Sequence, residues 1–150
     1  MRLVVKFKSK IYIDYDDVLS MCHNLTYDAS KIKPDLIVGI TRGGLLPALH
    51  LSHALERPMM TIQWQTRDAD KCEYNLELQD MIDKGKTVVF VDDINDTGRT
   101  FIEISNKYHG ARSNVHFMSL VKKRETLAHH ASAALSLDDE RWIVFPWEKD

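Results

Sequence analysis

The sequence predicts one α/β domain in which a mainly parallel central sheet is flanked by helices. Short apolar runs alternate with stretches whose apolar residues recur at helical spacing, which is the order of elements in a parallel sheet with crossover helices. The run "KTVVFVDD" (86–93) is nearly continuous in its apolar residues, as expected of a parallel strand covered on both faces. No internal repeat or low-complexity tract divides the chain, so we expect residues 1–150 to form a single domain.

The composition is that of a soluble globular protein and limits the classes of partner. Hydrophobic residues make up 44% and charged residues 28% of the 150 residues, and the formal net charge of −2 provides no general attraction to nucleic acid or to a membrane surface. Two cysteines are too few for a disulfide framework. No apolar stretch approaches the roughly 20 residues of a membrane span, and lysines interrupt the apolar residues at the N-terminus. We therefore expect a cytoplasmic protein that binds neither nucleic acid nor membrane.

The first half of the chain is expected to alternate strand and helix. After a short N-terminal strand, Asp14 can cap a helix, and a tight turn at 41–44 separates the strand 35–40 from a second helix in which Pro47 lies in the first turn. A further strand is expected at 59–64. The apolar residues expected to define the two helices are Tyr15, Val18, Leu19, Cys22 and Leu25 for the first, and Leu45, Ala48, Leu49, Leu51 and Leu55 for the second.

The second half begins with a polar segment. Residues 65–84 are weakly patterned and are expected to form a long loop or a mobile hairpin, which in a compact domain is usually functional or disordered. The strand 86–93 follows, and then a helix from about Thr97 with Phe101, Ile104 and Tyr108 on one face and Gly110 as its stop. A strand at 114–121 and a short last strand in the aromatic-rich 141–150 complete the expected order.

The stretch "FVDDINDTGRT" (90–100) places acidic and amide side chains directly after a buried strand. In a parallel α/β sheet, ligands bind beyond the carboxyl ends of strands. The backbone N–H groups and hydroxyls that open the following helix can cradle a phosphate, and carboxylates can accept hydrogen bonds from sugar hydroxyls or hold hydrated Mg²⁺. Helix capping alone would account for one acidic residue but not for Asp92, Asp93 and Asp96 together. The stretch therefore predicts a site for a phosphorylated sugar with a metal.

The same stretch resembles the phosphoribosyl-pyrophosphate-binding motif of type I phosphoribosyltransferases. "VGITRGGLLPALHLSHAL" (38–55) is similar to the pyrophosphate-binding loop and following helix of the purine members, and "VHFMSLVKKRE" with "ERWIVFPWE" resembles the base-binding strand and hood of xanthine-guanine phosphoribosyltransferases. These matches occur in the family's order from about residue 35 to the C-terminus. The resemblance implies the type I phosphoribosyltransferase fold with a small C-terminal hood.

The resemblance implies a set of residues that bind phosphoribosyl pyrophosphate. Asp92 and Asp93 would contact the ribose hydroxyls directly or through Mg²⁺, and Arg42 would hold the pyrophosphate beside the backbone of Gly43 and Gly44. The family's peptide bond before that arginine, here Thr41-Arg42, can be cis. The loop for the 5′-phosphate would comprise Asp96, Thr97, Gly98, Arg99 and Thr100.

The resemblance also assigns the residues that bind and activate the base. Asp96 would take the proton from N7 of a purine as N9 attacks the sugar, and Lys123 would donate to the 6-oxo group, with its neighbour Lys122 as an open alternative. Trp142 would stack on the purine ring and the Ile143 backbone would read the group at C2. The implied activity is transfer of the phosphoribosyl group to a 6-oxopurine such as guanine, xanthine or hypoxanthine in purine salvage by a homo-oligomer, either a dimer or a tetramer.

Two features depart from the family pattern. The segment 63–75 occupies the place of the loop that closes over the site, but it lacks the Ser-Tyr pair of the hypoxanthine-guanine enzymes, for which Trp64, Thr66 and Tyr74 could substitute. Asn95 stands where an aliphatic residue is usual, with a role in packing or in hydrogen bonding.

Two other functions are considered beside the transferase. A regulatory domain of the same fold that binds nucleotide without turnover is the main alternative. The presence of Asp96 and Lys123 argues against it, whereas the unusual closing segment keeps it open. A phosphatase with a D-x-D-x-T motif is disfavoured, because Asn95 replaces the second aspartate and the motif does not follow the first strand. The motifs G-x-x-x-x-G-K-[ST] and G-x-G-x-x-G are absent from the sequence, so it supports neither nucleoside triphosphatase nor dinucleotide chemistry.

Overall fold

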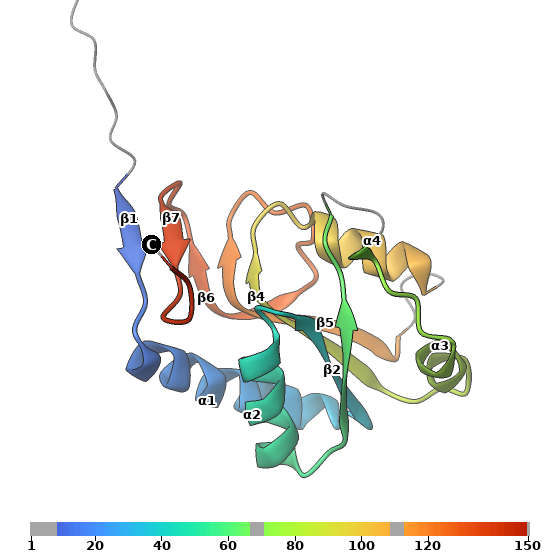
Figure 1. Ribbon diagram of the computed structural model, residues 1–150. Coiled ribbons are helices and arrows are strands. Elements are labelled where there is room, and N and C mark those ends of the chain that lie inside the picture. The colour runs from blue at the N-terminus through green and yellow to red at the C-terminus, as the bar shows by residue number, and fades with distance from the viewer. Residues whose placement is uncertain (1–8, 67–70, 109–112, 150) are drawn as a thin grey trace, which may run out of the picture.

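The computed structural model describes residues 9–66, 71–108 and 113–149, and its centre is a five-stranded parallel sheet. The strand order is β3-β2-β4-β5-β6, and each neighbouring pair is parallel. The bounds are Leu36–Thr41 for β2, Met59–Gln63 for β3, Val88–Asn95 for β4, Val115–Lys123 for β5 and Ser132–Leu137 for β6. Because all five strands point the same way, their carboxyl ends form one edge of the sheet (Figure 1).

Helices cover both faces of this sheet, as predicted. Alternate residues of the central strands pack on one side against α1 (Tyr15–Ile32) and α2 (Leu45–Leu55). The other residues of these strands pack on the opposite side against α3 (Leu76–Asp83) and α4 (Arg99–Lys107). The apolar residues at 88–91 are all fully buried, two toward each face, which explains why this run lacks the alternation of a half-exposed strand.

The two ends of the described chain form a second, two-stranded sheet. β1 (Lys10–Tyr12) pairs in parallel with β7 (Trp142–Val144), and the two lie side by side at the edge of the molecule (Figure 1). The Ile13 N–H donates to the Val144 carbonyl at 3.0 Å, which continues the pairing toward α1. The predicted C-terminal hood is therefore anchored by a strand from the beginning of the chain.

The first helix begins where the sequence predicts. Asp14 and Asp17 form a reciprocal capping box, with the Asp17 N–H donating to Asp14 Oδ1 at 2.7 Å and the Asp14 N–H donating to Asp17 Oδ2 at 3.1 Å. Val18, Cys22 and Leu25 are buried as expected. Four residues predicted to lie on the apolar faces of the first two helices are instead exposed. They are Tyr15 and Leu19 on α1 and Leu45 and Leu49 on α2.

The expected loop at 65–84 is wrong for its second half, where α3 forms. The Asn75 side chain caps this helix by accepting from the Leu78 N–H at 3.0 Å, and Leu78 and Ile82 bury its apolar face. The first half has hairpin-like pairing, because the Glu73 N–H donates to the Gln63 carbonyl at 2.8 Å. Residues 67–70 lie outside the described residues. An eight-residue helix with so few buried apolar positions gives a weak periodic signal in the sequence.

The bounds of β4 and α4 also differ from the sequence prediction, and one strand was not predicted. β4 continues to Asn95, two residues beyond its expected end, so the acidic pair lies within the strand. α4 begins at Arg99 rather than near Thr97, with Gly98 as its N-cap. β6 was not predicted, because its serines, alanines and leucines are all partly or fully exposed and bury little apolar surface. The expected helix stop at Gly110 lies outside the described residues.

Candidate functional site

The candidate site lies where the carboxyl ends of three adjacent strands meet. β2 ends at Thr41 and continues into the turn that holds Arg42, β4 carries the acidic pair, and β5 ends at Lys123. The peptide bond between Thr41 and Arg42 is cis, as the family resemblance implies. Chain segments separated by more than 80 residues thus contribute to one edge of the sheet, where parallel α/β proteins bind ligands.

The two glycines after Arg42 are required by close packing against β4. A Cβ atom on Gly43 would overlap the Asp93 carboxylate, and one on Gly44 would overlap the Val91 carbonyl oxygen. Sequence reasoning explained these glycines by the approach of a bound anion. The structure adds a second reason, since only glycine lets the turn after β2 lie against the acidic end of β4.

Asp92 and Asp93 are adjacent carboxyl groups, and each affects the pKa of the other. The Asp93 N–H donates to Asp92 Oδ1 at 2.8 Å. Burial, and then the charge of Asp93, hold the pKa of Asp92 well above its usual range. Burial also raises the pKa of Asp93, with a further contribution from the charge of Glu148, although a hydrogen bond from Asp92 acts in the opposite direction. The pair is therefore destabilised when both carboxylates are ionised and nothing positive is bound.

This electrostatic arrangement fits a divalent cation held partly by other ligands. Among the described residues, no group of three or more His, Cys, Asp or Glu side chains is placed to hold a metal. Mg²⁺ is commonly bound through one or two carboxylates, with water and substrate phosphates completing its coordination. Asp92 and Asp93 supply the oxygen ligands that such a site requires.

The loop from Asp96 to Thr100 leads into the N-terminal end of α4. Gly98 has a φ of 87° and serves as the N-cap without a side chain to satisfy the first helical N–H groups. The Arg99 N–H donates to Thr97 Oγ1 at 3.3 Å. The Arg99 side chain instead runs along the helix, where Nε donates to Glu103 Oε1 at 3.0 Å. The groups best suited to bind a phosphate are thus the backbone N–H groups at the N-terminal end of α4 and the hydroxyls of Thr97 and Thr100.

Two adjoining cavities meet at Asp93, and Asp92 is not among the residues that line either of them. The first has a volume of about 430 Å³ and includes Asp93, Asp96, Lys123, Trp142 and Ile143 among its lining residues. The second, about 1080 Å³, is lined on one side by the turn that contains Arg42 and Gly43. Asp93, Trp142 and Glu148 border both cavities. The structure therefore brings the residues predicted for the base and for the pyrophosphate to opposite sides of Asp93.

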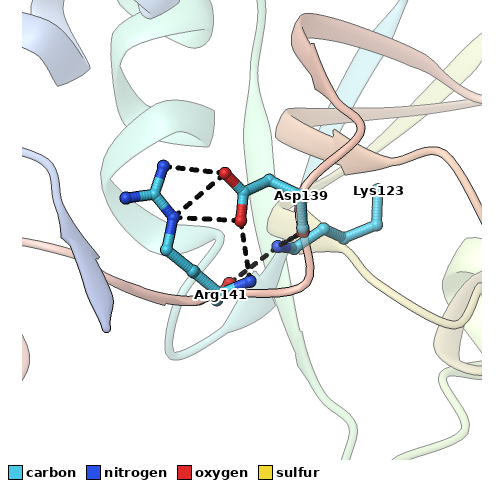
Figure 2. A network of polar contacts seen from close by, with 3 residues as sticks. All are labelled: Lys123, Asp139 and Arg141. Carbon is cyan, nitrogen blue, oxygen red and sulfur yellow. Dashed lines mark hydrogen bonds and ion pairs between the residues drawn. The ribbon is translucent and has the colours of Figure 1, made fainter. Parts of the chain in front are cut away.

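The Lys123 ammonium is oriented by backbone carbonyl groups of the turn before β7. Its Nζ donates to the carbonyl oxygens of Asp139 and of Arg141, the latter at 2.8 Å (Figure 2). An ammonium has three N–H donors, so one is left for a ligand in the first cavity. The Lys122 Nζ donates to the Ala131 carbonyl at 3.1 Å and does not line that cavity. Of the two neighbouring lysines, only Lys123 lines the first cavity.

The turn that holds Lys123 is itself fixed by an ion pair. Arg141 and Asp139 form a forked contact, with Nε 3.0 Å and Nη2 2.7 Å from Asp139 Oδ2 (Figure 2). The Arg141 guanidinium lowers the pKa of Asp139 to about 2. The pair therefore stays ionised throughout the neutral range.

Trp142 and Ile143 lie in β7, on the hood. The Trp142 side chain is 60% exposed and borders both cavities, whereas Ile143 is buried at the edge of the first. Such exposure of a large ring leaves one face open for stacking. Trp147 is already stacked on Phe145, with ring centroids 5.0 Å apart.

The aromatic residues of the segment 63–75 are not available to close the site. Trp64 is buried in the core that packs on α4, and its indole N–H donates to Glu103 Oε2 at 3.1 Å. Tyr74 stacks on Tyr108, and its hydroxyl donates to Gln79 Oε1 at 3.1 Å. The suggestion that Trp64 or Tyr74 replaces the family's Ser-Tyr pair is therefore not supported by their positions.

The described helices offer no candidate for a membrane span, since none of them is both long enough and apolar enough.

Comparisons with known proteins agree on the family. The phosphoribosyl transferase domain family matches residues 9–149. A xanthine-guanine phosphoribosyltransferase of Cereibacter sphaeroides is 29% identical over 118 residues, which cover 75% of this chain and 68% of that protein. The solved structure of a purine phosphoribosyltransferase from Pyrococcus horikoshii superposes with a TM-score of 0.78 at 30% identity, covering 94% of this chain and 95% of that chain.

A more distant structure supports the fold alone. The xanthine-guanine-hypoxanthine phosphoribosyltransferase of Helicobacter pylori has a TM-score of 0.67 at 20% identity, with 93% of this chain and 94% of that chain covered. The predicted family and fold class are thereby confirmed. The chain belongs to the family of proteins with a phosphoribosyl transferase domain.

Proposed function

We propose that the protein transfers the 5-phosphoribosyl group from phosphoribosyl pyrophosphate to N9 of a 6-oxopurine, releasing pyrophosphate and forming a nucleoside monophosphate. The observation that carries this proposal is the meeting of two cavities at Asp93, one lined by the Lys123 ammonium and Trp142 and the other by the Arg42 turn. A base and a leaving pyrophosphate require such adjoining spaces on either side of one sugar. The reaction would serve purine salvage in the cytoplasm.

The phosphoribosyl substrate would span from α4 to the turn after β2. Its 5′-phosphate would accept hydrogen bonds at the loop formed by Asp96, Thr97, Gly98, Arg99 and Thr100, where the positive end of α4 favours an anion. Asp92 and Asp93 would hold the ribose hydroxyls and Mg²⁺. When bound, Mg²⁺ supplies charge neutralisation to the pyrophosphate. Arg42, with the backbone of Gly43 and Gly44, would bind the same group from the second cavity.

The base would occupy the first cavity. The remaining N–H of Lys123 would donate to the 6-oxo group, Trp142 would stack on the ring, and the Ile143 backbone would contact the group at C2. Adenine presents an amino donor at C6, where the lysine also donates. The cavity should therefore discriminate against adenine.

The transfer step would depend on positioning and charge stabilisation. As the bond between C1′ and pyrophosphate breaks, positive charge develops on the ribosyl ring near the acidic pair, and N9 attacks C1′ from the base cavity. Asp96 lines that cavity and would accept the proton that leaves N7 of the base. Arg42 would stabilise the departing pyrophosphate.

The substrate class is tested by a panel of bases. Wild-type protein is supplied with phosphoribosyl pyrophosphate, Mg²⁺ and either adenine, hypoxanthine, guanine or xanthine, and nucleoside monophosphate is measured. We expect product with at least one 6-oxopurine and little with adenine. Lys123→Ala should lose at least about tenfold in kcat/KM for the 6-oxopurine, because a charge-assisted hydrogen bond is removed. A preference for adenine, or an unchanged kcat/KM in the variant, would contradict the assignment of Lys123.

A second candidate is a regulatory domain that binds nucleotide without turnover. The packing of Trp64 and Tyr74 in the core favours it, because the segment 63–75 then lacks the aromatic side chain that would exclude water from the reaction. The same panel separates the two functions, since tight binding of phosphoribosyl pyrophosphate without product from any base would support the regulatory domain.

We also propose that the protein is a homo-oligomer, either a dimer or a tetramer. Three leucines of α2, at positions 45, 46 and 49, are between 38% and 48% exposed, and all three line the second cavity. Such neighbouring apolar side chains are typical of subunit contacts. Sedimentation analysis should give a mass of at least twice 17.4 kDa, and a monomer at all concentrations would contradict the proposal.

A further inference from the structure

A buried polar network lies directly beneath the loop from Asp96 to Thr100. Asn95 is 2% exposed and Thr126 is fully buried. The Thr126 hydroxyl donates to Asn95 Oδ1 at 2.6 Å, and Asn95 Nδ2 donates to the Ala128 carbonyl at 3.2 Å. The ring of contacts closes through the Ala128 N–H, which donates to Thr126 Oγ1 at 3.1 Å. The amide and the hydroxyl thus satisfy each other and the backbone of the connection between β5 and β6.

Backbone contacts also join the loop 96–100 to the connection between β5 and β6. The Leu127 N–H donates to the Thr97 carbonyl at 2.9 Å. A Cβ atom on Gly98 would lie 2.5 Å from the Ala128 nitrogen and 2.6 Å from the Thr126 hydroxyl oxygen, so the two segments pack without room for a side chain. Three positions, 95, 97 and 98, are therefore held against 126–128.

We infer that Asn95 and Thr126 are positioning residues that fix the loop from Asp96 to Thr100 in the shape that binds the 5′-phosphate. This inference rests on the proposed function of that loop. Gly98 has a φ of 87°, which other residues adopt at a cost, and as the N-cap it has no side chain to accept from the first helical N–H groups. Of these, the Arg99 N–H donates to the Thr97 hydroxyl. The contacts with 126–128 supply the constraint that a capping side chain would otherwise provide.

The network also explains why an amide stands at position 95. Its oxygen accepts from Thr126 while its nitrogen donates to Ala128, a combination that no aliphatic side chain offers. An aliphatic residue at 95 would leave the buried Thr126 hydroxyl and the Ala128 carbonyl without these partners. Asn95 and Thr126 are therefore matched to each other across 31 residues of sequence.

The inference is tested with Asn95→Leu, Thr126→Val and the double variant. Asn114→Leu is the matched control, because its amide also bonds two backbone carbonyls, of Ile82 and Lys86, at the opposite end of β5. The dissociation constant of phosphoribosyl pyrophosphate with Mg²⁺ is measured by calorimetry, and the KM values for this substrate and for the base are measured separately. Amide hydrogen exchange at residues 96–100 is followed without ligand.

We expect each single variant to weaken binding of phosphoribosyl pyrophosphate about tenfold, as for a lost buried hydrogen bond, with the KM for the base changed far less. The double variant should lose less than the product of the two single effects, because both remove one network. Exchange at 96–100 should become faster in both variants but not in the control. Thr126→Ser, which keeps the hydroxyl, should behave as wild type.

An unchanged dissociation constant and unchanged exchange in folded variants would overturn the inference, even if the melting temperature falls as in Asn114→Leu. If both single variants fail to fold, the comparison of Thr126→Ser with Thr126→Ala decides, and equal binding in these two would also overturn it. Failure of the proposed function looks different. If the wild-type protein does not bind phosphoribosyl pyrophosphate, the proposed transferase function is contradicted. Hydrogen exchange at 96–100 still tests whether Asn95 and Thr126 hold the loop.

Discussion

At the scale of single residues, the site depends on groups that are unfavourable for the ligand-free fold. Asp92 and Asp93 are adjacent, partly buried and next to Glu148, and both have a raised pKa. Gly43 lies against the Asp93 carboxylate, with no space for a methyl group. Close approach of negative charges is an arrangement expected of a site that receives a cation and a polyhydroxylated substrate.

The acidic pair predicts a pH dependence of stability. At a pH well below the ordinary aspartate pKa of about 3.9, Asp92 is protonated in both the folded and the unfolded chain. As the pH rises, Asp92 ionises first in the unfolded chain, because its pKa in the folded protein is raised. The free energy of unfolding of the wild type therefore falls until the pH passes the pKa of Asp92 in the folded protein. Asp92→Asn removes this loss. We expect the variant to gain on the wild type from about pH 4 upward, by at most about 1.4 kcal/mol per pH unit.

Urea unfolding of both proteins at pH 4, 6 and 8 without metal measures this gain. Turnover should fall in Asp92→Asn, since the amide carries no charge for the ribose and Mg²⁺ site. Parallel stability curves for the wild type and the variant across this range would contradict the assigned burial of the acidic pair.

At the scale of elements, the strongly apolar strands and the capped helix were predictable, and the short marginal elements were not. The run at 88–91 and the box at Asp14 carry local signals that do not depend on the rest of the fold. α3 and β6 bury few apolar residues, and their stability comes from contacts made only in the folded chain. The sequence therefore predicted a loop for the polar segment 65–84, although the second half of this segment contains a helix.

The cap of α3 provides a test at this scale. Asn75→Ala removes the oxygen that accepts from the Leu78 N–H, and we expect a loss of about 1 kcal/mol in the free energy of unfolding. Because Asn75 lines neither of the two cavities at the site, the KM values for both substrates should not change. Asn75→Asp, which keeps an accepting oxygen, should retain most of the stability. Equal unfolding free energies for Asn75→Ala and wild type would show that the cap contributes nothing.

At the scale of the whole molecule, the sequence predicts the sheet, its helical layers and the edge that carries the site. The convergence of the Arg42 turn, the acidic pair and Lys123 follows from parallel strands whose carboxyl ends share one edge. Contacts between distant segments could not be predicted. Three such contacts depend on how distant parts of the chain come together in the fold. They are the pairing of β1 with β7, the close approach of Gly43 to Asp93, and the hydrogen bond between Thr126 and Asn95.

The central claim is phosphoribosyl transfer, and the rate of nucleoside monophosphate formation from phosphoribosyl pyrophosphate and guanine in the presence of Mg²⁺ tests it most directly. The wild type should form product with release of one pyrophosphate per nucleotide, and Asp96→Ala should lower kcat by a factor of about 100 or more, as for loss of a general base. Absence of product from a folded protein that binds phosphoribosyl pyrophosphate would contradict the account. Full activity in Asp96→Ala would remove this residue from the chemistry.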